Sequence, residues 1–349
     1  MNVHSLLAAL LAAGFALTTG PAAASNCKML QIADWPVRPG RGVPIVDGAI
    51  NGQKIGVMLD TGSSISLIVR AAADRLGLSR QETRGLRVFG IGGETQAQAT
   101  VVDEFSIGGV TRKNLRFMVA GERDLGKNLD VILGEDFLDQ LDVEFDLGHK
   151  SVKLFQPNDC EGVSLAYWAT QSASEVAMES FLDAGPRIVV QVQVNGQTMR
   201  ALLDSGSRTS VLDKSAAEQV GITPDSPGVE ANGKGGGLGA KSVEFWSAPL
   251  QSFAIGNETI RDTPIGFADL WKDATYTPTG SHLPRRVQGN PPVLLGADFL
   301  RAHRVLVAHS QHKVYFTYEG GPVFQTTGAP GPRSPPPAAE NAKRSTSEE

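Results

Sequence analysis

Two acidic turns are the residues of this sequence that could carry out chemistry. Asp60 lies in "MLDTGSS" and Asp204 lies in "LLDSGSR", each after an apolar run. Two carboxyl groups held close together cannot both ionise readily, so one keeps its proton while the other is charged. The charged carboxylate can take a proton from a water molecule that attacks an amide carbon, while the protonated one supports the developing oxyanion. If the two turns meet, the sequence predicts amide-bond hydrolysis.

The residues after each aspartate suit a tight turn. A hydroxyl residue can hydrogen-bond locally, and the glycine that follows lets the turn tighten where a Cβ would clash. A single Asp-Ser/Thr-Gly is common in loops and would indicate only a turn. The residues expected to support the pair are Thr61, Gly62, Ser63, Ser205, Gly206 and Ser207.

An internal repeat relates the two turns. Residues 50–68 align without gaps on residues 194–212, which lie 144 positions later. "VILGEDFL" (131–138) matches "VLLGADFL" (293–300), now 162 positions apart, so the second copy carries 18 more residues. Most of the additional residues fall in 268–292, which we expect to form an irregular surface loop. Two units related by an approximate two-fold axis would bring Asp60 and Asp204 into one site.

Each copy is predicted to be mostly β. Asn51-Gly52 and Asn195-Gly196 are typical of hairpin turns, and the continuous apolar run before each aspartate is typical of a strand covered on both faces. A short Ala-rich helix follows in each copy and ends at Gly77 or Gly221.

Taken together, these motifs resemble the retropepsin-like aspartic peptidase family, with two halves fused in one chain as in pepsin-like enzymes. The resemblance covers roughly residues 43–155 and 187–318, joined by a linker at 156–186. It implies an all-β fold of two tandem barrel domains with short helices, related by a pseudo-two-fold axis, and an active site at their interface. It also implies that Asp60 and Asp204 are catalytic, that the substrate is a protein or peptide, and that the monomer is active.

The resemblance assigns roles to further residues. The second family signature, an apolar residue and a glycine beneath each catalytic loop, corresponds to Leu133-Gly134 and Leu295-Gly296. Flap and substrate-binding positions are expected at Gly90, Ile91, Gly92, Gly93, Gly236, Gly237 and Leu238.

The sequence departs from the family pattern in two places. Arg208 stands where the first copy has Ser64. We expect it to form a structural ion pair, for instance with Asp298 or Asp213; if it faced the aspartates instead, it would lower a carboxyl pKa. Neither flap carries the tyrosine of a pepsin-like flap.

The two ends of the chain differ from the repeat. Residues 1–24 resemble a secretory signal with an A-x-A-type cleavage site, and their apolar run is short for a membrane anchor. A segment at 25–42 leads into the first copy. The last residues, 326–349, are rich in proline, small and charged residues, which predicts a disordered tail. We therefore expect an exported protein, periplasmic or secreted, with no membrane insertion of the mature chain.

Cys27 and Cys160 are the two cysteines. In an exported protein they could form a disulfide, or they could remain separate thiols.

Other function classes have less support. A net charge of −5 does not favour nucleic-acid binding. The six histidines show no HExxH spacing. His303 and His309 lie near a strand and could suggest a metal site, but surface or loop positions are the preferred interpretation. The sequence predicts no metal and no cofactor. The alternative function is a retropepsin-like binding or scaffolding module without catalysis, although such a module has no chemical need for both aspartates.

Overall fold

A computed structural model describes residues 26–40, 42–126, 129–179, 187–276, 283 and 285–326, without the side chains of Arg84, Tyr276 and Arg286. The expected signal at 1–24 lies outside the described residues, as does the expected tail apart from Thr326.

The first copy of the repeat forms a six-stranded barrel. Its strands, in order around the barrel, are β2 (Ile45–Ile50), β3 (Gln53–Leu59), β8 (Val131–Leu133), β4 (Leu67–Val69), β7 (Val110–Ala120) and β6 (Gly93–Ile107). Pairing of β2 with β6 closes the barrel, and β5 (Gln81–Gly90) extends beyond it as a hairpin with β6. Helix α1 (Arg70–Arg75) follows β4.

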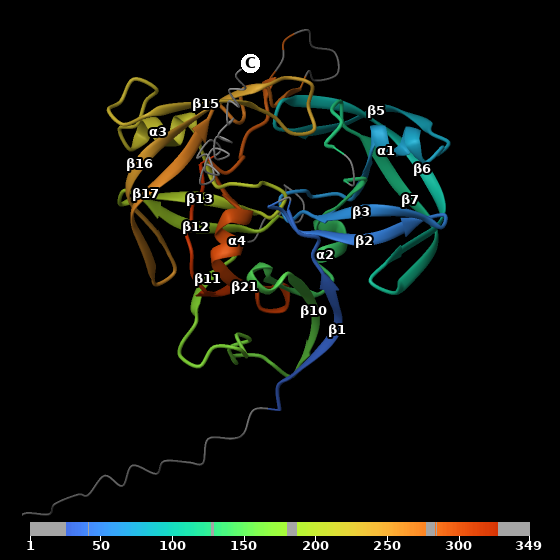
Figure 1. Cartoon of the computed structure of the whole chain (residues 1–349), viewed down its shortest axis with the longest axis horizontal. Coiled ribbons are helices and arrows are strands. Elements are labelled where there is room, and N and C mark those ends of the chain that lie inside the picture. The colour runs from blue at the N-terminus through green and yellow to red at the C-terminus, as the bar shows by residue number, and fades with distance from the viewer. Residues whose placement is uncertain are drawn as a thin grey trace, which may run out of the picture.

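The second copy forms an equivalent barrel. Its strands are β12 (Val189–Val194), β13 (Gln197–Asp204), β20 (Val293–Gly296), β14 (Val211–Asp213), β17 (Glu258–Ala268) and β16 (Val243–Ile255). Pairing of β12 with β16 closes it, β15 (Glu230–Gly235) forms the second hairpin with β16, and α3 (Lys214–Gln219) follows β14. The predicted all-β fold of two tandem barrels is confirmed, and the barrels lie side by side in Figure 1.

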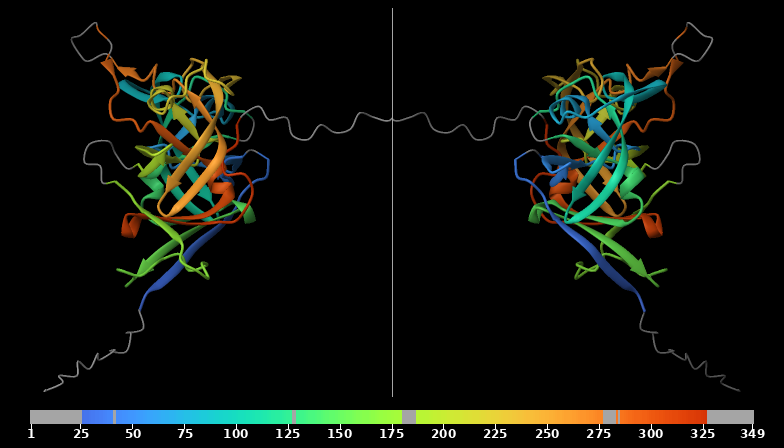
Figure 2. Two further views of the ribbon diagram at one scale, coloured as in Figure 1. Left: turned by 90° about the vertical axis from the view of Figure 1, so that its left-hand side faces the viewer. Right: turned by 90° about the vertical axis from the view of Figure 1, so that its right-hand side faces the viewer.

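A third sheet joins the two halves. Its strand order is β1 (Lys28–Pro36), β10 (Ser151–Asn158), β9 (Asp142–Asp146), β21 (His303–Ala308), β22 (Lys313–Tyr318) and β11 (Ser174–Ala177). The antiparallel pairing of β9 with β21 connects strands from different halves. This sheet lies at the end of the molecule opposite the β5 and β15 hairpins, as Figures 1 and 2 show.

Local sequence explains the turns and helices of each barrel. Asn51-Gly52 and Asn195-Gly196 all have positive φ and form the β2–β3 and β12–β13 hairpins. Such backbone angles favour Asn and Gly, because other side chains meet steric clashes there. Gly77 and Gly221 also have positive φ, directly after the two short helices.

Short helices and hairpins complete the described structure. After the second signature come α2 (Glu135–Leu138) and α4 (Ala297–Ala302), and short 3-10 turns η1 (Leu147–His149) and η2 (His309–Gln311) lead into the last strand of each half. Residues 268–292 contain the two-stranded β18 (Thr275–Tyr276) and β19 (Arg285–Arg286). The expected surface-loop assignment is wrong for part of this segment, because Leu270 and Ala274 are buried.

A disulfide joins Cys27 to Cys160. It lies where β1 begins and just beyond the end of β10, whose residues Lys28 and Asn158 are paired. The described helices are all too short to cross a bilayer.

Candidate active site

The two acidic turns meet between the barrels. Asp60 follows the last residue of β3, and Asp204 is the last residue of β13. Each glycine makes room for the opposite carboxyl group: a Cβ on Gly62 would lie 2.5 Å from Asp204 Cγ, and a Cβ on Gly206 would lie 2.4 Å from Asp60 Cγ. The structure therefore brings the two predicted aspartates into one site, with their carboxyl groups hydrogen-bonded to each other.

A reciprocal set of hydrogen bonds joins the two loops. The Thr61 hydroxyl donates to the Leu203 carbonyl (2.7 Å) and accepts from the Ser205 N–H (3.0 Å). The Ser205 hydroxyl donates to the Leu59 carbonyl (2.7 Å) and accepts from the Thr61 N–H (2.9 Å). Both side chains are buried, so these bonds are shielded from water and hold the aspartates in register.

The electrostatics of the two carboxyl groups differ. Burial raises the pKa of Asp60 well above its ordinary value, and the charge of Asp204 raises it further. Burial also raises the pKa of Asp204, but the Ser207 N–H and the hydrogen bond from Asp60 oppose that rise. Both pKa values are raised, so one carboxyl of the pair keeps its proton while the other ionises.

The serines that follow stabilise the turns. The Ser207 N–H donates to Asp204 Oδ1 at 2.9 Å, and the Gly62 N–H donates to Asp60 Oδ1 at 2.9 Å. The Ser63 hydroxyl donates to the Ile65 carbonyl and the Ser207 hydroxyl to the Thr209 carbonyl.

The second signature lies directly beneath the loops. The Asp60 N–H donates to the Leu133 carbonyl at 2.9 Å, and Leu203 pairs with Leu295 in parallel β strands. A Cβ on Gly134 would lie 2.6 Å from the Ser63 carbonyl oxygen, and one on Gly296 would lie 2.5 Å from the Thr209 backbone. Glycine is needed at both positions because the backbone of each catalytic loop packs directly on the backbone of the glycine.

One further Ser–Asp pair holds each loop, and the sequence prediction missed this role. Ser66 donates to Asp136 (2.6 Å), and Ser210 donates to Asp298 (2.7 Å). The matching "DFL" tripeptides of the repeat are the signal that could have revealed them.

The expected ion pair of Arg208 is wrong. The Asp298 carboxylate accepts hydrogen bonds from Ser210, Phe299 and Gln325, and Asp213 caps α3 and accepts from the Leu270 N–H. Arg208 instead lies exposed along the cleft and forms no ion pair with a carboxylate among the described side chains.

The hairpin tips interlock above the aspartates. The Gly237 and Gly239 N–H groups donate to the Ile91 carbonyl (3.1 and 3.2 Å), and the Lys241 N–H donates to the Gly92 carbonyl (3.0 Å). Ile91 packs on apolar residues of the second barrel, whereas Leu238 packs beside Gly90 and Gly121 of the first. Gly92 and Gly93 shape the tip and do not line the cleft, unlike the other expected flap residues.

Arg123, which follows β7 of the first barrel, binds the second flap, and the sequence prediction missed it. Its guanidinium donates to the carbonyls of Gly239 and Ala240 and to the Ser242 hydroxyl, at 3.1, 3.0 and 2.7 Å. It therefore fixes the second hairpin to the first barrel.

A cleft of about 750 Å³ runs between the flaps and the aspartates. Both barrels supply apolar walls, including Met58, Leu129, Ile132, Leu202, Phe245 and Trp271. Leu270, Trp271, Ala274, Val287 and Asn290 come from the segment that was expected to be only a surface loop. The arrangement can enclose an extended chain against two acidic groups.

A fold of two barrels with paired acidic loops at their interface defines an aspartic-peptidase type of protein. A model of the aspartyl protease family matches residues 46–137 and 190–299, so the chain belongs to this family. A curated relative from Sinorhizobium sp, named "Uncharacterized protein in cobV 5'region", is 30% identical over 95 residues, which are 27% of this chain. The match covers 40% of that relative's length.

The expectation that His303 and His309 are surface or loop residues is wrong for His303, which begins strand β21, whereas His309 begins the short turn η2. His303 is buried against Phe299, with a hydrogen bond between Nε2 and Glu258 Oε1 at 2.9 Å. His309 Nε2 lies 3.6 Å from Glu135 Oε2, under the Asp60 loop. Burial raises the pKa of Glu135 to about 9 and lowers that of His309 to about 4, so both groups are neutral near pH 7. Among the described side chains, no group of three or more His, Cys, Asp and Glu could hold a metal ion.

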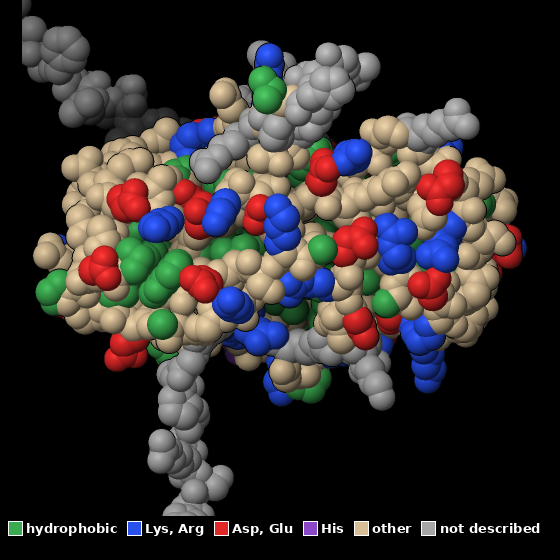
Figure 3. Space-filling model, turned by 90° about the horizontal axis from the view of Figure 1, so that it is seen from above, with side chains coloured by type: hydrophobic (Ala, Val, Ile, Leu, Met, Phe, Trp, Pro, Cys, Tyr) green, Lys and Arg blue, Asp and Glu red, His purple; other side chains and the backbone are tan. Residues whose placement is uncertain are grey.

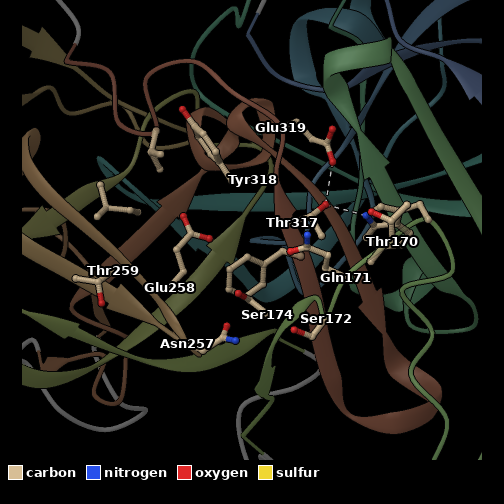
Figure 4. A pocket seen from close by; sticks show the side chains of 15 residues that line it. Thr170, Gln171, Ser172, Ser174, Asn257, Glu258, Thr259, Thr317, Tyr318 and Glu319 are labelled. Carbon is tan, nitrogen blue, oxygen red and sulfur yellow. Dashed lines mark hydrogen bonds between the residues drawn. The ribbon is translucent and has the colours of Figure 1, made fainter.

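A second hollow of about 860 Å³ lies away from the aspartates, beside the end of β22 in the shared sheet. Figure 4 shows Glu258 and Tyr318 on one side and Thr317 and Glu319 on the other. Both carboxylates already have partners, since Glu258 binds His303 and Glu319 accepts from the Thr317 hydroxyl.

Proposed function

We propose that the protein is an exported aspartic endopeptidase that cleaves extended or flexible protein segments. The observation that carries this proposal is the meeting of Asp60 and Asp204 in one site, with the pKa of Asp60 raised further than burial alone would raise it. A binding module would not require two carboxyl groups in this costly arrangement.

In the proposed reaction a water molecule binds between the two carboxyl groups. The ionised carboxyl of the pair removes a proton from this water as the water oxygen attacks the peptide carbonyl carbon. The protonated carboxyl of the pair donates a hydrogen bond to the developing oxyanion. The tetrahedral intermediate then re-forms a C=O bond and breaks its C–N bond, as the amine leaving group takes the proton that the base had removed from water. The pair is left with one proton, as at the start.

The cleft supports an extended substrate. Strands of the two flaps lie above it, so their backbone groups can pair with a peptide backbone while the apolar walls receive alternate side chains. Such binding requires a segment without stable structure of its own. One chain supplies both halves of the site, which supports activity as a monomer.

Export is supported by the signal-like residues 1–24 and by the disulfide between Cys27 and Cys160, because disulfides persist in oxidising compartments. A bacterial periplasm is the proposed location.

Cleavage of an unfolded protein tests the proposal. The purified protein is incubated with the substrate at several pH values, with and without a statine-type inhibitor, alongside Asp60→Asn and Asp204→Asn. We expect cleavage by the wild type, inhibition by the statine, and loss of cleavage in each variant. Undiminished cleavage by both variants would contradict the proposal, whereas binding of the unfolded protein without cleavage would favour the binding module.

A further inference from the structure

The side chains that line the cleft carry more positive than negative charge. Apart from Asp60 and Asp204, its described lining contains no carboxylate, but it contains four cations: Arg87, Arg187, Arg208 and Lys234. Figure 3 shows Lys and Arg side chains across the middle of the face that carries the hairpins, with acidic side chains between them. This imbalance would favour an acidic chain in the cleft.

Two of the four cations already have acidic partners. Arg87 forms an ion pair with Glu94, and Lys234 Nζ lies 3.5 Å from Glu244 Oε1. All four of these side chains are at least partly exposed, so the two ion pairs are weak. Each pair nevertheless reduces the attraction between its cation and a substrate carboxylate.

Arg187 differs from these residues because its guanidinium is partly buried and incompletely paired. Nη1 donates to Asn290 Oδ1 at 3.3 Å, while the buried Nε has no hydrogen-bond partner. Burial and the nearby charge of Arg200 lower the pKa of Arg187. Among the described residues no carboxylate forms an ion pair with it. A buried cation of this kind is stabilised by an incoming anion.

The internal repeat shows that this cation is specific to one side of the cleft. Arg187 lies 144 positions after Val43, which is the offset of the repeat. The next residue along the chain has the same role in each half: the Pro44 carbonyl accepts from the Leu59 N–H, and the Ile188 carbonyl accepts from the Leu203 N–H. Val43 and Arg187 are therefore equivalent positions. The equivalent position on the other side holds the apolar Val43, whereas Arg187 places a cation on its own side. Arg208 lies on the Val43 side, since its Cγ would be 3.0 Å from a Cβ on Gly42.

We propose that the cleft selects peptide segments with an aspartate or glutamate near an apolar cleavage site, and that Arg187 pairs with that carboxylate. Arg208, which is more exposed, supplies a weaker contact on the other side of the bond. Pairing with a carboxylate would use a terminal nitrogen of Arg187, because the Nε is buried. This inference rests on the proposed peptidase function and adds the substrate class.

Matched peptides test the inference. A flexible peptide with an apolar centre carries a single glutamate, moved one position at a time, and each peptide has a glutamine counterpart. For the wild type we expect kcat/KM to favour glutamate by about tenfold at one or two positions on one side of the cut. The preference should weaken as ionic strength rises. In Arg187→Gln the ratio should fall to about one, and in Arg208→Gln it should fall less.

The ratio of two substrates is measured within one protein sample, so a change in the amount of folded enzyme does not affect it. Arg112→Gln, an exposed residue of β7 outside the cleft, is the matched control and should keep the wild-type ratio. Equal cleavage of glutamate and glutamine peptides at every position, or an unchanged ratio in Arg187→Gln, would overturn the inference and leave the peptidase function standing. If the wild type cleaved neither the peptides nor an unfolded protein, the proposed function would fail as well.

Discussion

Glycine at two positions determines how closely the acidic side chains approach each other. Gly62 and Gly206 each face the carboxyl group of the opposite loop, at distances where a Cβ cannot fit. Thr61 and Ser205 then fix the loops by hydrogen bonds in both directions. At the scale of single residues, the site is built by leaving space for carboxyl groups as much as by supplying them.

Gly206→Ala should separate the pair. The added Cβ would meet Asp60 Cγ at 2.4 Å, so the carboxyl group must move. A displacement of about 1 Å commonly lowers catalysis by about 100-fold, and we expect kcat to fall at least that far. Gly148→Ala is the control because nothing lies within 4 Å of its Cβ. Equal kcat for both variants, measured on one peptide, would show that the carboxyl groups do not need this geometry.

Glu135 should make stability depend on pH. Its pKa in the folded protein is about 9 against an ordinary value of 4.5, so the folded state retains a proton that the unfolded state loses between these values. Its contribution to the free energy of unfolding is therefore fully present below pH 4.5 and falls by about 1.4 kcal/mol per pH unit up to pH 9.

Replacement of Glu135 by Gln removes this dependence. Glu135→Gln should gain stability over the wild type as pH rises from 5 to 8, measured by urea unfolding, by about 1 to 4 kcal/mol in all. The exposed Glu161→Gln serves as control. A difference that stays constant with pH would mean that Glu135 is already ionised in the folded protein over this range, and would contradict the raised pKa.

At the scale of elements, the two hairpins act together over the cleft. Each places an apolar residue on the opposite barrel, and backbone hydrogen bonds join the tips. The β5–β6 hairpin and its Gly-rich tip could be predicted from the sequence, because turn residues and strand patterns are local. The contact between the tips could not, since it joins residues about 150 positions apart whose sequences carry no mark of it.

Arg123→Gln should loosen the second hairpin. The variant loses charged hydrogen bonds to Gly239, Ala240 and Ser242, so closure over a peptide becomes less favourable. We expect KM to rise about three- to tenfold, with faster amide hydrogen exchange at residues 237–242. Arg116→Gln, exposed on β7, should change neither. Unchanged exchange and KM in Arg123→Gln would show that the hairpin is held by other contacts.

At the scale of the whole molecule, the internal repeat predicts most of the architecture. It gave two equivalent β units, the matching turns at Asp60 and Asp204, and the glycines beneath them. The shared sheet was not predicted, because the pairing of β9 with β21 joins Phe145 to Val305 and depends on how the barrels meet. The position of Arg187 in the cleft was missed for the same reason.

The disulfide should stabilise the shared sheet. It closes a sequence separation of 133 residues and anchors β1, an edge strand. The double variant Cys27→Ser/Cys160→Ser should lose about 2 to 5 kcal/mol of unfolding free energy, and a reductant should lower the stability of the wild type alone. Urea unfolding with and without reductant measures both effects. Equal stability of the two proteins would show that strand pairing alone holds β1.

A double-mutant cycle at the two aspartates tests the central claim, that both carboxyl groups act on one water molecule. Kinetics of peptide cleavage are compared for wild type, Asp60→Asn, Asp204→Asn and the double variant, with circular dichroism confirming that each is folded. Each single substitution should lower kcat by about 1,000-fold, and the double substitution should lower it little further, because the pair functions as a unit. Losses that multiply in the double variant would mean that the aspartates act independently, and would contradict the account.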